Sequence, residues 1–176
     1  MWDWNSQLRL GKSSALVKTH LRRLPLTETA LEADFFLDAT ASNRGGERWI
    51  GMVVEKDFGG LLAMEDARFE PPTANDLAML LAHAMLQPLN GGSRQRPRTV
   101  YLRDRPQWHE LLPHLRQLGM AVVLTDDLPE FGEAAAAWIQ HRTARRSLTT
   151  EQIHTALCRP FPERRTTCVE DDHVRY

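Results

Sequence analysis

The densest group of basic side chains in the sequence lies between residues 94 and 105. Five arginines occur in this short segment, namely Arg94, Arg96, Arg98, Arg103 and Arg105. An arginine side chain binds phosphate oxygens through two parallel N–H donors, so this pattern is compatible with contacts to the phosphates of a nucleic acid. Only Tyr101 and the nearby Trp108 add aromatic rings, which does not indicate a stacking platform for single-stranded bases. A solvated loop explains the same pattern equally well.

One carboxylate stands out because it lies in an apolar stretch. Asp38 follows Phe36 and Leu37 in the segment DFFLDATA, residues 34–41. Strand alternation places its side chain on the same face as that of Phe36. Burial of an unpaired carboxylate is costly, so we expect Asp38 to have either a functional role or a basic partner across the sheet, such as Arg48.

The first half of the sequence has the two-residue period of strands. Strands are predicted at residues 34–41, 47–56 and 61–69, and glycine-rich turns separate them. Short turns between consecutive strands favour an antiparallel meander. A short helix is expected before the strands, over residues 13–24.

The period then changes to that of helices alternating with short buried strands. A helix is predicted to begin after Thr73, with Asp76 completing a capping box, and to end near Gln87. Asp104 is expected to cap the next helix, and a third helix is expected to run to residue 141. Strands are predicted between these helices, at residues 99–103 and 120–125.

This order of elements predicts an α/β fold with a five-stranded mixed sheet and helices on both faces. The last two strands each follow a helical crossover, so they should be parallel to their neighbours. The order resembles that of the ribonuclease H-like fold over residues 34–141. A ferredoxin-like or small doubly wound sheet is the alternative. Residues 1–33 are interpreted as an N-terminal extension, 142–157 as a linker and C-terminal helix, and 158–176 as a mobile tail.

A second resemblance is carried by residues 97–133. The segment PRTVYLRD at 97–104, Trp108, and the later segments LGMAV at 118–122 and DDLP at 126–129 are similar to a bacterial domain family, mainly cyanobacterial. That family has no established activity, so the resemblance implies no mechanism.

The ribonuclease H-like resemblance implies a set of catalytic acids. Nucleases with this fold carry acids on the first strand, in the first helix, at the end of the fourth strand and on the last helix, where they bind two divalent metal ions. The matching residues are Asp38, Asp76, Asp104 and Glu133. Two departures weaken the match, because the first helix is apolar at 77–81 and the last helix has only alanines at 134–137. Helix capping and surface exposure also explain three of these four acids.

Composition limits the remaining classes of function. The chain has 176 residues, a net charge of −1 and two cysteines, Cys158 and Cys168. No apolar run is long enough to span a membrane, and the first residues do not form a secretory signal, so we expect a cytoplasmic protein. His154, Cys158, Cys168 and His173 have the residue types of a zinc site, but their spacing does not match a standard one.

Two functional hypotheses follow. The favoured one is a non-catalytic binding or regulatory module that presents charged loops and termini to a protein partner and needs no cofactor. The alternative is a magnesium- or manganese-dependent phosphodiesterase that acts on RNA or DNA, in which the arginines at 94–105 would hold the phosphate backbone. The sequence leaves the partner and the oligomeric state open.

Overall fold

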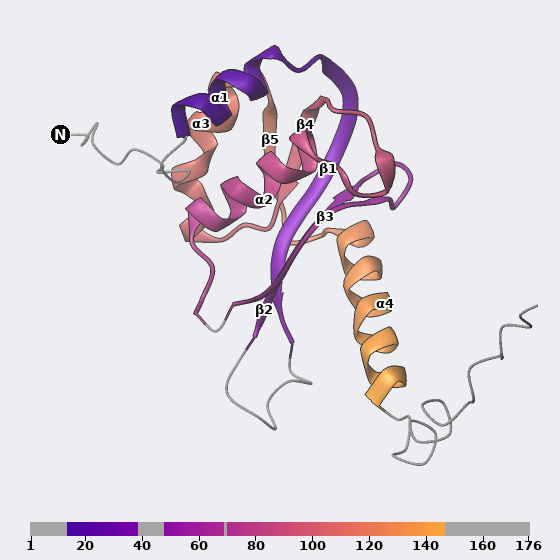
Figure 1. The fold of residues 1–176 in the computed structure, drawn as a ribbon. Coiled ribbons are helices and arrows are strands. Elements are labelled where there is room, and N and C mark those ends of the chain that lie inside the picture. The colour runs from indigo at the N-terminus through magenta and orange to yellow at the C-terminus, as the bar shows by residue number, and fades with distance from the viewer. Residues whose placement is uncertain (1–13, 39–47, 69, 147–176) are drawn as a thin grey trace, which may run out of the picture. The chain divides into compact units, whose positions relative to one another are not determined.

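The computed structural model describes residues 14–38, 48–68 and 70–146 (Figure 1). Of the segment 142–157, interpreted as a linker and C-terminal helix, residues 147–157 lie outside the described residues. The tail at 158–176, the four residues considered for zinc and residues 39–41 of the first predicted strand also lie outside them. By its internal contacts the chain divides into Met1–Thr143 and Ala144–Tyr176. Every element below belongs to the first unit, except the last residues of α4.

The sheet has five strands in the spatial order β3-β2-β1-β4-β5. β1 pairs with β2 and β2 with β3 in antiparallel fashion, whereas β4 is parallel to both β1 and β5. β1 is therefore the central strand. The strands are β1 (Leu26–Leu37), β2 (Trp49–Glu55), β3 (Leu61–Arg68), β4 (Arg96–Leu102) and β5 (Ala121–Leu124).

Helices precede, connect and follow the strands. They are α1 (Ser14–Arg23), α2 (Ala74–Leu86), the 3₁₀ helices η3 (Leu89–Gly91) and η4 (Pro106–Leu111), α3 (Leu112–Gln117) and α4 (Pro129–Arg146). Three antiparallel strands followed by two parallel crossovers, in this strand order, define a ribonuclease H-like fold. The sequence-based fold prediction is confirmed. No helix in the described ranges is long and apolar enough to cross a membrane.

The first strand begins at Leu26 and not at residue 34, where the sequence pattern placed its start. The early residues of β1 pair with β4, whereas β2 pairs with β1 only from Leu31 onward. With a neighbour on one side only, the segment LTETA stays partly exposed and keeps polar side chains. Because of these polar side chains, the segment lacks the apolar pattern by which a strand is recognised in a sequence. The sheet thus includes residues that the sequence analysis assigned to the N-terminal extension.

Two apolar clusters cover the two faces of the sheet. On one face, Phe35 and other apolar side chains of β1, β2 and β4 pack against α1, α2 and α3. On the other face, Ile50, Met52 and Val54 of β2 pack against Phe131 and Ala135 of α4. Figure 1 shows α4 apart from the other helices. A three-layer arrangement results, with the sheet in the middle.

α4 lies along the central strand. The ring of Phe36 makes edge contacts with Phe131 and with Trp138, at centroid distances of 6.2 and 5.7 Å. These two helix residues are about two turns apart. Because Glu32 contacts Phe131 and Asp38 contacts Arg142, α4 runs in the same direction as β1. The next turn of α4 brings Arg142 to the carboxyl end of β1, beside Asp38.

Candidate functional site

Three buried carboxylates lie on the central strand. Glu32, Asp34 and Asp38 occupy alternating positions of one strand face, together with Phe36. Their exposed fractions are 0%, 0% and 1%. A buried carboxylate destabilises a fold unless it is paired and hydrogen-bonded, so the partners of these three groups decide what the site can do.

Glu32 is held by α4 and by the turn after β2. Lys56 Nζ donates to Glu32 Oε1 at 2.7 Å, and the backbone N–H of Phe131 donates to Glu32 Oε2 at 2.9 Å. The hydrogen bond to Glu32 raises the pKa of Lys56, because it stabilises the charged ammonium group. Phe131 is in the first turn of α4, where backbone N–H groups lack helical acceptors. Glu32 therefore serves as a cap for α4 supplied by a distant strand.

Asp34 is held by the segment that follows β4. Arg105 Nη2 lies 2.8 Å and Arg103 Nε 3.0 Å from Asp34 Oδ2, and the indole Nε1 of Trp108 donates to Oδ1 at 3.3 Å. Arg105 Nη2 also donates to the carbonyl oxygen of Phe35 at 3.1 Å. Burial nevertheless raises the pKa of Asp34, because the loss of water outweighs the attraction of the two guanidinium groups.

Asp38 lies at the end of the strand, beside α4. Arg142 Nη1 is 3.7 Å from Asp38 Oδ2, and the backbone N–H of Asp38 donates to the carbonyl oxygen of Arg48 at 2.7 Å. The expected neighbour Arg48 thus contacts Asp38 through its backbone, and α4 brings the guanidinium group of Arg142 beside the carboxylate. We call Arg103, Arg105 and Arg142, with Asp34 and Asp38, the arginine rim.

The other three predicted acids lie in different surroundings. Asp76 Oδ2 accepts from the backbone N–H and the hydroxyl of Thr73, both at 2.8 Å, and completes the expected capping box of α2. Glu133 is exposed on α4. Asp104 does not cap the helix after β4, so that prediction is wrong: Arg105 is the N-cap of η4 and makes no side-chain cap bond. Asp104 Oδ1 instead lies 3.2 Å from His109 Nε2.

These acids do not form a two-metal centre. Within the described ranges no group of three or more His, Cys, Asp or Glu side chains could hold a metal ion, and all four predicted acids are in those ranges. Two-metal chemistry needs carboxylates that share ions about 4 Å apart. Asp76 is instead part of a helix cap, and Asp38 lies beside a guanidinium group. The donor set therefore does not fit magnesium or manganese.

The five predicted phosphate-binding arginines fall into two groups. Arg96 Nε donates to the carbonyl oxygen of Leu24 at 3.1 Å, and its Nη1 donates to that of Leu118. Arg98 forms an exposed ion pair with Glu28 at 2.8 Å. Arg94 is exposed in the preceding loop. Arg96 and Arg98 lie in the first half of β4 and Arg94 precedes it, so roughly 16 Å of strand separates Arg98 from Arg103. A single surface with all five arginines is therefore not formed.

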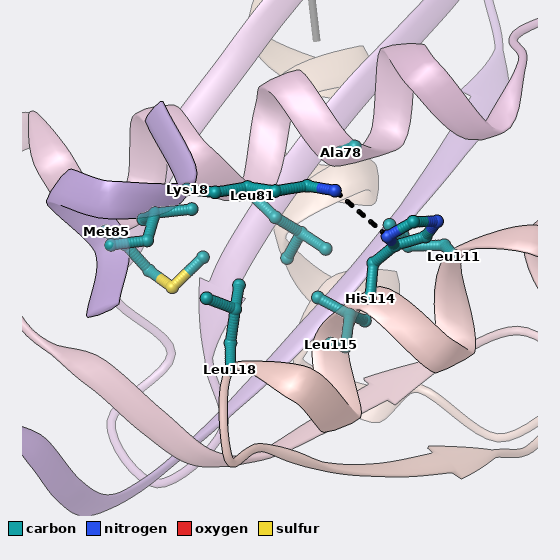
Figure 2. A pocket seen from close by; sticks show the side chains of 9 residues that line it. Lys18, Ala78, Leu81, Met85, Leu111, His114, Leu115 and Leu118 are labelled. Carbon is teal, nitrogen blue, oxygen red and sulfur yellow. Dashed lines mark hydrogen bonds between the residues drawn. The ribbon is translucent and has the colours of Figure 1, made fainter. Parts of the chain in front are cut away.

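Two hollows lie away from the rim. A pocket of about 230 Å³ at the amino ends of β1 and β4 is lined by Thr29, Leu31, Glu55, Leu62, Gly92, Ser93, Gln95 and Pro97, with Glu55 as its charged group. A much smaller apolar cavity, of about 20 Å³, lies among α1, α2 and α3. Figure 2 shows Lys18 and His114 reaching toward each other above it, with Nζ and Nδ1 3.1 Å apart. Neither hollow is lined by an arginine.

Sequence reasoning missed four members of this arrangement: Glu32, Asp34, Trp108 as a hydrogen-bond donor, and Arg142. The sequence does contain a pattern that points to Glu32 and Asp34. The segment LEADFFLD places acids at alternating positions with Asp38, which predicts one shared strand face. The partners carried no such signal, because they come from turns and helices far away in the sequence.

The comparisons with known proteins add little to this geometry. No protein-family model and no curated protein matches the chain, so the resemblance of residues 97–133 to a bacterial family stays a prediction. The chain is similar to the catalytic core domain of HTLV-2 integrase in complex with magnesium, with 14% sequence identity and a TM-score of 0.45 over 77% of this chain and 86% of that chain.

A second similar structure is the simian T-cell lymphotropic virus intasome in complex with the PP2A regulatory subunit B56 gamma. It has 13% identity and a TM-score of 0.47, over 85% of this chain and 57% of that chain. Likenesses of this degree carry no information about activity. We therefore base the ribonuclease H-like assignment on the order and pairing of the strands.

Proposed function

We propose that this chain is a non-catalytic binding module with a ribonuclease H-like fold, and that the arginine rim is the surface it presents to a protein partner. The observation that carries the proposal is the pairing of the buried carboxylates of β1 with basic side chains of the same chain. Fold alone does not imply function, so the chemistry of the site decides.

The pairing of these carboxylates argues against catalysis because of the ligands that divalent metals need. Magnesium and manganese bind to carboxylate oxygens that carry negative charge and are open to solvent. Asp34 is fully buried with its oxygens facing Arg103, Arg105 and Trp108. A metal ion at this position would have to displace cations that are covalently part of the protein, at a carboxylate whose pKa is already raised.

The alternative function is a metal-dependent nuclease that acts on RNA or DNA. The test is incubation of the full chain with single- and double-stranded RNA and DNA in buffers that contain magnesium or manganese. We expect no cleavage above that of a buffer blank. Metal-dependent cleavage by the wild-type chain that disappears in Asp38→Asn, but persists in the matched surface variant Asp57→Asn, would overturn the proposal.

A further inference from the structure

We infer that the partner of the arginine rim is an acidic protein segment that also carries apolar side chains. This inference rests on the proposed function and names its ligand class. It depends on three properties of the rim: the positions of its guanidinium groups, the apolar surface beside them, and the way its aromatic rings are covered.

Arg105 is held in place before any partner arrives, because its Nη2 donates to Asp34 Oδ2 and to the carbonyl oxygen of Phe35, and Arg103 and Arg142 lie beside the two carboxylates as ion pairs. The contacts with Asp34 and Asp38 use one nitrogen of each arginine, and a guanidinium group carries three. The side chains of Arg103, Arg105 and Arg142 are 37%, 25% and 26% exposed. Arginine donors that are already ordered lose less conformational freedom when they bind a carboxylate.

The charge of the rim favours an acidic ligand. Three guanidinium groups face two buried carboxylates, so one guanidinium charge of the rim has no buried counterpart. Asp104, between Arg103 and Arg105 in the sequence, is an exposed acid that contacts His109, which is charged only when protonated. Side-chain carboxylates of a partner can therefore pair with the outward N–H groups through charge-assisted, bidentate hydrogen bonds.

An apolar surface lies beside Arg105. Leu37, at the end of β1, is 37% exposed, and it pairs with the half-buried Trp49 of β2. The guanidinium group of Arg105 lies over the ring of Trp49, with Cζ 6.0 Å from the ring centroid. A ligand that alternates acidic and apolar side chains would contact both kinds of surface at once.

The same features disfavour a nucleic acid. Arg105 and Arg142 each cover one face of a tryptophan ring, with Arg142 Cζ 4.8 Å from the centroid of Trp138. Unpaired bases need open aromatic faces on which to stack. Duplex binding needs several phosphate contacts along a continuous basic surface, whereas Arg96 donates to backbone carbonyl oxygens and Arg98 lies roughly 16 Å from Arg103 along β4.

The experiment uses the full chain and three fluorescent probes. The first probe is a 12-residue peptide of alternating glutamate and leucine, the second is the same peptide with glutamine in place of glutamate, and the third is a 12-nucleotide oligouridylate. Fluorescence anisotropy at two salt concentrations measures binding. We expect the acidic peptide to bind at least about tenfold more tightly than the other two, with weaker binding at high salt.

Variants locate the binding. In Arg103→Gln/Arg105→Gln the affinity for the acidic peptide should fall about tenfold, whereas the matched variant Arg98→Gln, at the other end of β4, should bind like the wild type. The double variant leaves Asp34 with fewer partners and can unfold. A second measurement therefore uses wild-type chain labelled with ¹⁵N, in which the peptide should shift the indole N–H signal of Trp49 and the Nε–H signals of Arg103 and Arg105.

The outcomes separate the two proposals. Equal affinity for the acidic and neutral peptides, or unchanged signals of Trp49 and both arginines, overturns the inference and leaves the non-catalytic proposal standing. Tighter binding of the oligouridylate at these residues overturns the inference and the protein partner of the proposed function, and leaves the proposed absence of catalysis standing. Metal-dependent cleavage of the oligouridylate would overturn both.

Discussion

At the scale of single residues, each acid of β1 is bound to a basic side chain that arrives from another element. Lys56 comes from a turn, Arg103 and Arg105 follow a neighbouring strand, and Arg142 comes from α4. Removal of one partner from a buried ion pair leaves an uncompensated charge, which is more costly than the pair is favourable. Single substitutions at these positions should therefore have large and distinguishable effects.

Glu32→Ala tests whether the buried carboxylate caps α4. The variant loses the acceptor for the Phe131 N–H and the partner of Lys56, so its free energy of unfolding should fall by about 3 kcal/mol. Urea denaturation measures this change. The matched control is Glu28→Ala on the same strand, where the exposed ion pair with Arg98 should contribute little. Equal stability of the two variants would contradict the capping role.

Asp34→Asn tests the raised pKa of that carboxyl group. The ordinary pKa of an aspartate is 3.8, and burial raises it in the folded state. Between these two values the folded state binds more protons than the unfolded state, so the contribution of Asp34 to stability is present at lower pH and is lost as the pH rises. Denaturation at a series of acidic pH values should show the wild type losing stability relative to the variant as the pH increases. The opposite slope would mean that the arginines dominate.

At the scale of secondary structure elements, two close approaches fix the layers. α4 contacts β1 and the residue after it at three positions of one face, Glu32, Phe36 and Asp38. On the opposite face, β2 has a glycine at the point where Phe35 and α2 come closest. A side chain at Gly51 would place its Cβ 2.5 Å from Phe35 Cε1 and 2.8 Å from Leu80 Cδ2.

Gly51→Ala should therefore destabilise the protein by about 1–3 kcal/mol, because the added methyl group overpacks the core. The matched control is Gly132→Ala on α4, where an added Cβ would meet no atom within 4 Å. That change should stabilise the helix by about 0.5–1 kcal/mol, since alanine has the better helix propensity. Thermal unfolding of both variants measures the difference. A Gly51→Ala variant as stable as the wild type would show that α2 can move away from β2.

The pH dependence of stability tests the environment of His114, at the junction of α1 and α3. Burial, and secondarily the nearby ammonium group of Lys18, lowers the pKa of His114 below its ordinary value of 6.5. The unfolded state then binds a proton more readily, so stability should fall as the pH drops below about 6.5. This fall should be smaller in His114→Gln. Parallel stability–pH curves for the two proteins would contradict the lowered pKa.

At the level of elements, the sequence predicts most of the architecture. The change from a two-residue period to a helical period gives the order of strands and helices, and Thr73 with Asp76 marks the start of α2. The early part of β1 was missed, because a segment with a neighbour on one side needs no apolar side chains. The rim could be predicted only in part. The apolar neighbours of Asp38 mark it as an unusual carboxylate in the sequence. Arg142 cannot be told from the other basic residues until the position of α4 along β1 is known.

At the scale of the whole molecule, the fold brings acids to the central strand and the chain then neutralises them with its own cations. Asp34 is the clearest case, because two arginines and an indole N–H face its carboxylate. The proposed absence of catalysis and the proposed acidic ligand both follow from this pairing. If metal ions replaced these cations at the carboxylates, neither proposal would hold.

The most direct test is a titration of the full ¹⁵N-labelled chain with manganese, observed at the indole N–H signals. Trp108 Nε1 lies 3.3 Å from Asp34 Oδ1, so a paramagnetic ion bound to this carboxylate would broaden the signal of Trp108 beyond detection. We predict that at substoichiometric manganese the Trp108 signal stays as sharp as those of the other tryptophans. Selective loss of the Trp108 signal, reversed in Asp34→Asn, would show that the carboxylate binds metal and would contradict the account.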